Sequence, residues 1–209
     1  ANLAIGDDRF ALTLAEFSGR YQNVPLELAQ AATLIPTDSG FNLTLPGLNV
    51  GSGRVSANGQ IGDQLNIDAQ LDGFPLGLIE NFTSTGQAID GNLTARATIT
   101  GSSSAPKVDY RYQANGFSVA LSRSNQLSSL SLSGSGTFAN NQLSMQNDIQ
   151  GGGASARANG TINLASNALN IDVSGQLPFE YLAQPPSRAG IRLTGAASID
   201  AQITGSTSV

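Results

Sequence analysis

Cysteine, histidine and tryptophan are all missing from this 209-residue chain. Without cysteine the chain forms no disulfide and no thiolate metal site, and without histidine it has no histidine general base and no histidine-ligated zinc. The lack of tryptophan, with only four tyrosines, weakens any platform for stacking against sugar rings. We therefore expect no catalytic centre, metal or cofactor, and we expect that the protein is not an enzyme.

Charge is also scarce. Charged residues make up 12% of the chain, which is about half of what is usual for a soluble domain. The net charge is −5 and the ten Lys and Arg residues are scattered singly, so no basic stripe follows a nucleic acid backbone. The sequence has no run of eighteen apolar residues and no signal peptide, and we expect any targeting segment to lie outside it.

What the chain has instead is a regular alternation of apolar and polar residues. Residues 65–71, LNIDAQL, alternate throughout, and so do residues 93–99, 108–112, 117–121, 169–173 and 197–203. Neighbouring side chains of a strand point to opposite faces, so each of these segments would have one apolar and one polar face. The pattern predicts a meander of many antiparallel strands.

Turn signals and two denser apolar segments interrupt the alternation. Residues 75–82 and 178–183 are rich in apolar groups and each begins with a proline, so we expect short helical inserts there. Five pairs of Asn, Asp and Gly predict hairpin turns: Asn58-Gly59, Gly62-Asp63, Asp90-Gly91, Asn115-Gly116 and Asn140-Asn141.

The sequence repeats internally. The tetrapeptide LNID at 65–68 recurs at 169–172, an offset of 104 (169 minus 65), and TGS at 100–102 recurs at 204–206. We therefore expect residues 1–209 to form one continuous domain of about two copies of a unit, the second cut off at Val209. Because that copy is incomplete, we expect the chain to be a piece of a longer repetitive protein.

The periodicity alone leaves two architectures open. Two apolar faces can close on each other in a sandwich or barrel. Alternatively, a sheet of about ten or more strands can curl into an open trough with an aliphatic lining. Asp68 and Asp172 occupy equivalent positions in the two copies, but each follows an isoleucine, which places it on the polar face. We expect these two carboxylates to be solubilising rather than catalytic.

The repeated unit resembles a known family. GNLTARATITG at 91–101, followed by SAPKV at 104–108, is similar to the recurring pattern of the TamB family and its AsmA-like, bridge-like lipid transfer relatives. LNIDAQLDGFPLGLIENF at 65–82 and its second copy from residue 169 resemble the same family. NVPLELAQAATLI and LNVGSGRVSANGQI, near the N-terminus, do so as well, so the resemblance covers nearly the whole chain.

This resemblance implies an all-β fold, a long curved antiparallel sheet that forms a taco-like open trough with an aliphatic concave face. It implies a periplasmic protein of a Gram-negative bacterium, anchored in the inner membrane, with a TamA-like outer-membrane barrel as partner. The implied function is passage of phospholipid between the two membranes, with the acyl chains on the inward face. The residues expected on that face are Val55, Leu65, Ile67, Leu71, Leu93, Ile99, Val119, Leu121, Leu132, Met145, Leu169, Ile171, Val173, Leu193 and Ile199.

Two other functions stay open from the sequence. A scaffold that assists the assembly of outer-membrane or autotransporter proteins would use exposed sheet edges to pair with nascent strands. A β-solenoid adhesin or passenger would be rich in Gly, Ser and Asn, as this chain is. However, rungs of about 20 to 30 residues are expected in a solenoid, and the repeat here is far longer.

Overall fold

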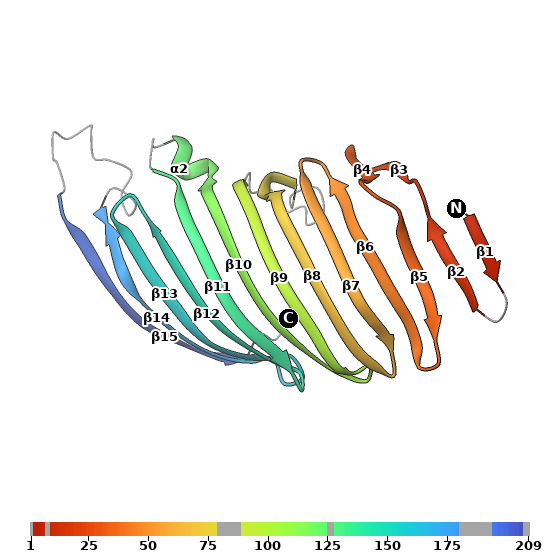
Figure 1. The fold of residues 1–209 in the computed structure, drawn as a ribbon. Coiled ribbons are helices and arrows are strands. Elements are labelled where there is room, and N and C mark those ends of the chain that lie inside the picture. Colours follow the sequence, from red (N-terminus) through yellow and green to blue (C-terminus); the bar gives the residue numbers. More distant parts are fainter. Residues whose placement is uncertain (1, 7–8, 79–88, 125–127, 180–193, 207–209) are drawn as a thin grey trace.

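The computed structural model describes residues 2–6, 9–78, 89–124, 128–179 and 194–206. These residues form fifteen strands, one 3-10 turn and one short helix (Figure 1). The elements are β1 (Asn2–Gly6), β2 (Arg9–Leu14), β3 (Ser18–Tyr21), β4 (Val24–Leu28), β5 (Ala32–Thr37), β6 (Gly40–Val50), β7 (Gly53–Gly62), β8 (Gln64–Pro75), η1 (Leu76–Leu78), β9 (Ile89–Ser102), β10 (Ala105–Val119), α2 (Ala120–Ser124), β11 (Leu130–Ala139), β12 (Gln142–Gly151), β13 (Ala154–Asn163), β14 (Ala168–Pro178) and β15 (Ala196–Ser206).

All the strands belong to one antiparallel sheet. From β5 to β15 they pair in chain order, β2 pairs with β5, and the small hairpin of β3 and β4 joins the sheet along β6. The bowed strands follow one another across the molecule without returning to the first (Figure 1), and β1 and β15 do not pair in the part of the chain that is described. The predicted all-β class and the open, trough-like sheet are therefore confirmed.

Little of this sheet is buried. The chain exposes 13103 Å² for a mass of 21.4 kDa, whereas a compact monomer of that mass exposes about 9,100 Å². Among the described residues only five apolar side chains are buried, Val24, Val50, Leu76, Ala114 and Ala154, and none of them falls below 2% exposure. In the described residues a single sheet layer therefore carries this fold, and no second layer of them covers its apolar face.

Three bulges bend the sheet at one end. They lie in β6 between Leu45 and Leu48, in β8 between Leu71 and Phe74, and in β10 within residues 114–118. Each inserts one extra residue relative to a neighbouring strand, which increases the local twist and bends the strand. Because β6, β8 and β10 run in the same direction, all three bulges lie toward the end of the sheet where η1 and α2 are found (Figure 1).

The first predicted insert is confirmed for its residues 76–78, which form the 3-10 turn η1. The side chain of Leu76 is 7% exposed, and Leu78 reaches over Gly51, where a Cβ would stand 2.9 Å from Leu78 Cδ1. In the second predicted insert, Phe179 has a helical conformation and its backbone N–H donates to the Gly195 carbonyl at 3.1 Å. Residues 79–82 and 180–183 lie outside the described residues.

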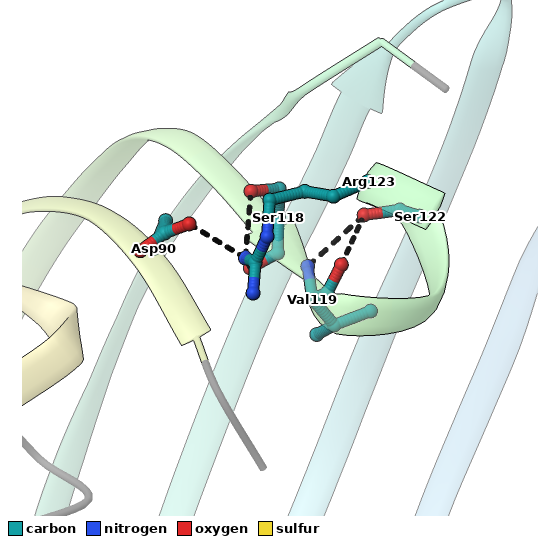
Figure 2. A network of polar contacts seen from close by, with 5 residues as sticks. All are labelled: Asp90, Ser118, Val119, Ser122 and Arg123. Carbon is teal, nitrogen blue, oxygen red and sulfur yellow. Dashed lines mark hydrogen bonds and ion pairs between the residues drawn. The ribbon is translucent and has the colours of Figure 1, made fainter. Parts of the chain in front are cut away.

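The helix α2 was not predicted, because the alternation at residues 117–121 indicates a strand. A polar network holds this short helix against the sheet (Figure 2). Ser122 Oγ accepts from the Val119 N–H at 3.0 Å and donates to the Val119 carbonyl at 2.9 Å. Arg123 pairs with Asp90 at 2.6 Å and donates to the Ser118 carbonyl at 3.2 Å.

The end of strand pairing explains why the chain turns helical there. The ladder from β10 to β11 ends at Phe117 with Leu130, and the ladder from β10 to β9 ends at Val119 with Ile89. Beyond Val119 the backbone groups have no strand partner in the described residues, so local bonds satisfy them instead. The prediction of a strand through Leu121 is therefore wrong.

Two of the five predicted turns are correct. Gly62-Asp63 lies at the junction of β7 and β8, and Asn140-Asn141 joins β11 to β12 with φ values of 51° and 59°. The other three are wrong, since Asn58-Gly59 lies inside β7, Asp90-Gly91 inside β9, and Asn115-Gly116 forms the bulge of β10.

The pairing of strands repeats along the chain with the same offset as the sequence. Leu65, Ile67 and Ala69 of β8 pair with Gly101, Ile99 and Ala97 of β9. The residues 104 positions later, Leu169, Ile171 and Val173, pair with Gly205, Ile203 and Ala201 in β14 and β15. The bulge of β8 is absent from the register of β14 with β15, so the two hairpins differ in curvature.

Candidate functional site

The apolar residues of successive strands line up across one face of the sheet, which we call the apolar face. One row of mutually paired residues crosses eleven strands and contains only apolar side chains and glycine. Its members, from β5 to β15, are Leu34, Leu43, Gly59, Ile67, Ile99, Val108, Phe138, Leu143, Ile162, Leu169 and Gly205.

The opposite face carries the matching polar rows. Asp68 pairs with Asn58 and Thr98, and Thr98 Oγ1 donates to Asp68 Oδ1 at 2.8 Å. Arg96 and Arg111 stand directly opposite each other on the next polar row. Asp68 and Asp172 are exposed, which agrees with their predicted place on the polar face. Because neighbouring side chains of a strand point to opposite faces, the same strands separate a largely hydrocarbon-like surface from a hydrated one.

A hollow of about 560 Å³ opens on the apolar face, beside η1. The exposed atoms of its wall are apolar, and the side chains that form it include Val55, Leu71, Leu76, Leu93, Tyr112 and Leu132. Leu76 is held there because the β8 bulge carries the chain over the sheet end before β9 begins. The hollow offers van der Waals contact and displacement of water, because Arg96 and Arg111, which also line it, expose no polar atom into it.

Of the fifteen residues expected on the inward face, thirteen are described there and all thirteen are half-buried. Four line the hollow, namely Val55, Leu71, Leu93 and Leu132. Nine extend the face along the strands: Leu65, Ile67, Ile99, Val119, Met145, Leu169, Ile171, Val173 and Ile199. Leu121 lies in α2 rather than in a strand and its side chain is not described, and Leu193 lies outside the described residues.

The sequence reasoning missed several members of the hollow. Tyr112, Ala114 and Phe117 of β10 line it, and so does Leu76 of η1. The signal for Tyr112 was present, since residues 108–112 alternate, but an aromatic ring was not expected in an aliphatic lining. Leu76 was not among the residues expected on this face, although the apolar density of residues 75–82 was the signal that the insert folds over it.

On the polar face, Asp109 is held in its ionised form by two neighbours. Lys107 Nζ lies 2.8 Å from Asp109 Oδ2, and Thr137 Oγ1 donates to Asp109 Oδ1 at 2.7 Å. These bonds lower the pKa of Asp109 from its ordinary value, with the Lys107 bond the larger cause. A carboxylate with a lowered folded-state pKa stabilises the protein above its unfolded pKa, and that stability is lost as the pH falls through the folded pKa.

We therefore expect a small acid-dependent loss of stability that depends on Asp109. Between about pH 5 and about pH 2, the urea midpoint of the wild type should fall more than that of Asp109→Asn. Asp172→Asn is the matched control, because Asp172 is exposed and accepts no side-chain hydrogen bond from the described residues. The same reduction of acid sensitivity in both variants would contradict a specific role of Lys107 and Thr137.

Other kinds of site find no support in the described part of the chain. No group of three or more Asp and Glu residues is arranged to hold a metal ion there. None of the described helical segments has the length and hydropathy that crossing a bilayer requires. Among known proteins, no family, no curated protein and no solved structure matches the chain. The apolar face with its hollow is therefore the candidate functional site.

Proposed function

We propose that the apolar face carries the acyl chains of phospholipids, so that the chain acts as a lipid conduit rather than as an enzyme. One observation carries the proposal: a continuous apolar row crosses eleven strands, its apolar side chains are only half-buried, and no second layer covers it in the described part of the chain. Exposed apolar surface of this extent is unfavourable in water, and a monomeric protein rarely presents it without a ligand or partner.

The energetics of hydrocarbon suit such a surface. Burying a methylene is worth about 0.8 kcal/mol, so ten methylenes with about half of their surface covered would gain about 4 kcal/mol. No directional group is needed for this gain, because the hydrophobic effect is non-directional. A lipid can therefore bind and still slide, since neighbouring places on an aliphatic face have similar free energies.

The setting of this function is proposed from the sequence resemblance to the TamB family. In it the chain lies in the periplasm as part of a protein anchored in the inner membrane, and it moves phospholipid between the inner and outer membranes. A TamA-like outer-membrane barrel is the proposed partner of the full-length protein. The polar face, with Asp68, Arg96 and Arg111, would contact water in that compartment.

Site-specific photo-crosslinking tests the conduit. A photoreactive phenylalanine analogue at Ile67 or Ile171 is expected to capture phospholipid in living cells, because both residues lie on the apolar face. The same analogue at Asp68 or Asp172, one residue further along each strand, is expected to capture none. The measurement is mass spectrometry of the lipid attached to the purified protein.

The neighbouring positions serve as matched controls, since they share the strand, the compartment and the expression level. Equal capture of phospholipid on both faces would contradict the conduit. Capture of protein but no lipid at Ile67 and Ile171 would contradict it as well.

A second candidate function is a scaffold for the assembly of outer-membrane strands. Its candidate edge is β15, which pairs only with β14 among the described residues and whose residues are mostly exposed. An unpaired edge offers backbone groups to an incoming strand. Crosslinks from Ser198 or Gln202 of β15 to nascent protein, together with no lipid at Ile67, would favour the scaffold over the conduit.

A further inference from the structure

A polar pair interrupts the apolar face. Asn147 of β12 lies where the alternation of that strand calls for an apolar residue, and it shares a row with Gly134 of β11 and Tyr112 of β10. Tyr112 reaches across β11, and its hydroxyl donates to Asn147 Oδ1 at 2.9 Å. This row continues into Ala158 and Val173, so the pair is surrounded by apolar neighbours.

Two glycines make room for this arrangement. A Cβ on Gly134 would stand 2.8 Å from Cζ of Tyr112, and a Cβ on Gly136 would stand 2.6 Å from the Tyr110 hydroxyl. The two tyrosine rings therefore lie across β11, over positions where a side chain would displace them. Both hydroxyls are thus placed on the apolar face itself, rather than at its rim.

Hydrogen-bonding capacity is left over at this place. Tyr112 uses its only hydrogen on Asn147 Oδ1, which leaves the amide nitrogen of Asn147 with two hydrogens and no acceptor among the described residues. The Tyr110 hydroxyl likewise has no hydrogen-bond partner in the described part of the chain. Burial raises the pKa of both tyrosines, so each hydroxyl keeps its hydrogen at neutral pH.

We propose that the Asn147 amide and the Tyr110 hydroxyl form a donor site for the ester carbonyl of an acyl lipid on the apolar face. This inference rests on the proposed function, which it deepens by adding a preference for esterified acyl chains. Tyr112 also lines the hollow of about 560 Å³, so a chain seated in the hollow would have its carbonyl end beside Asn147.

The physical reason is the cost of drying a carbonyl. Removing a carbonyl from water without a new hydrogen-bond donor costs free energy. A hydrogen bond from an amide or a hydroxyl offsets this cost. Pure hydrocarbon gains nothing at this place. The site would therefore favour acyl esters over alkyl chains and would set where along the face the ester end pauses.

A pair of matched lipids tests this preference with the purified chain. The probes are 1-monooleoyl glycerol, which has an ester carbonyl, and 1-O-oleyl glycerol, an ether that lacks it, and both displace a fluorescent fatty acid. The wild type is expected to bind the ester about fivefold more tightly, which is the size of one neutral hydrogen bond. Asn147→Leu is expected to reduce the ratio to about one, because it removes the amide and leaves ether binding intact.

Two further variants separate binding from structure. Tyr112→Phe keeps the ring over Gly134 but frees the Asn147 amide to turn, and we expect it to lower the ester preference without loss of the fold. Asn159→Leu makes the same chemical change on the polar face of β13 and is expected to keep the full preference. Circular dichroism of each variant establishes that the sheet has formed.

The outcomes distinguish this inference from the function on which it rests. If both lipids bind the wild type equally, or if Asn147→Leu keeps the preference, the donor site is wrong and the conduit stands. If neither lipid displaces the probe, both are wrong.

Discussion

Ile171→Asp is expected to leave the sheet folded and to reduce the affinity for 1-monooleoyl glycerol by at least about tenfold. Ile171 lies on the apolar face between Gly160 of β13 and Ile203 of β15. An acyl chain passing there would have to dry the new carboxylate, and removing the water from an unpaired charge costs several kcal/mol. In the free protein the carboxylate stays hydrated, because no second layer of the described residues covers it. The measurement is displacement of a fluorescent fatty acid, with circular dichroism for the fold.

Asn170→Asp is the control for this substitution. It adds the same charge one residue earlier in β14, on the exposed polar face, and we expect normal affinity. Unfolding of Ile171→Asp would show that this position is ordinary core of a closed structure. Unchanged affinity would show that lipid does not contact the C-terminal strands.

The strands and their faces could be predicted because their signal is local. In a segment such as residues 65–71, each apolar side chain is two positions from the next, and a strand places them on one face whatever the partner strand is. The predicted faces of Ile67 and Asp68 follow from this alone. Whether two such faces close on each other is a property of the whole sheet, so periodicity left the open and closed forms undecided.

The turns could not be predicted as reliably, because pairs of turn-forming residues have a similar local signature in three different settings. Asn140-Asn141 is a real hairpin turn with both residues at positive φ. Asn115-Gly116 is a bulge in β10, and Asn58-Gly59 is plain strand. At Gly59 the close approach of the β8 backbone explains why a glycine stands inside a strand, and β8 lies outside the local sequence window.

The polar pair on the apolar face, Asn147 and Tyr112, could not be predicted from the sequence for a related reason. Asn147 sits at an apolar position between Met145 and Ile149, and alternation alone makes it an irregularity. Its partner Tyr112 is 35 residues away, and only the register of three strands brings them together over a glycine. A site built across strands is invisible until the register is known.

The largest loss of stability is expected from Gly59→Ala. Gly59 has φ of 144°, and a Cβ there would stand 2.7 Å from the Cα of Ile67 in the neighbouring strand. The substitution combines backbone strain with overpacking against a backbone that cannot rotate away, so we expect a loss of about 3 to 5 kcal/mol. The measurement is urea unfolding followed by circular dichroism.

Gly73→Ala separates these two causes. Gly73 also has positive φ, at 59°, but it lies at the β8 bulge with no atom within 4 Å of a Cβ. The free energy of unfolding of Gly73→Ala should therefore fall only by the cost of the left-handed conformation, about 1 to 2 kcal/mol. The open sheet has little buried core and few other contacts to offset the larger loss, so Gly59→Ala should also weaken acyl binding at the hollow, while Gly73→Ala should keep it. Equal losses in the two variants would mean that β7 and β8 do not pack as closely as their register places them.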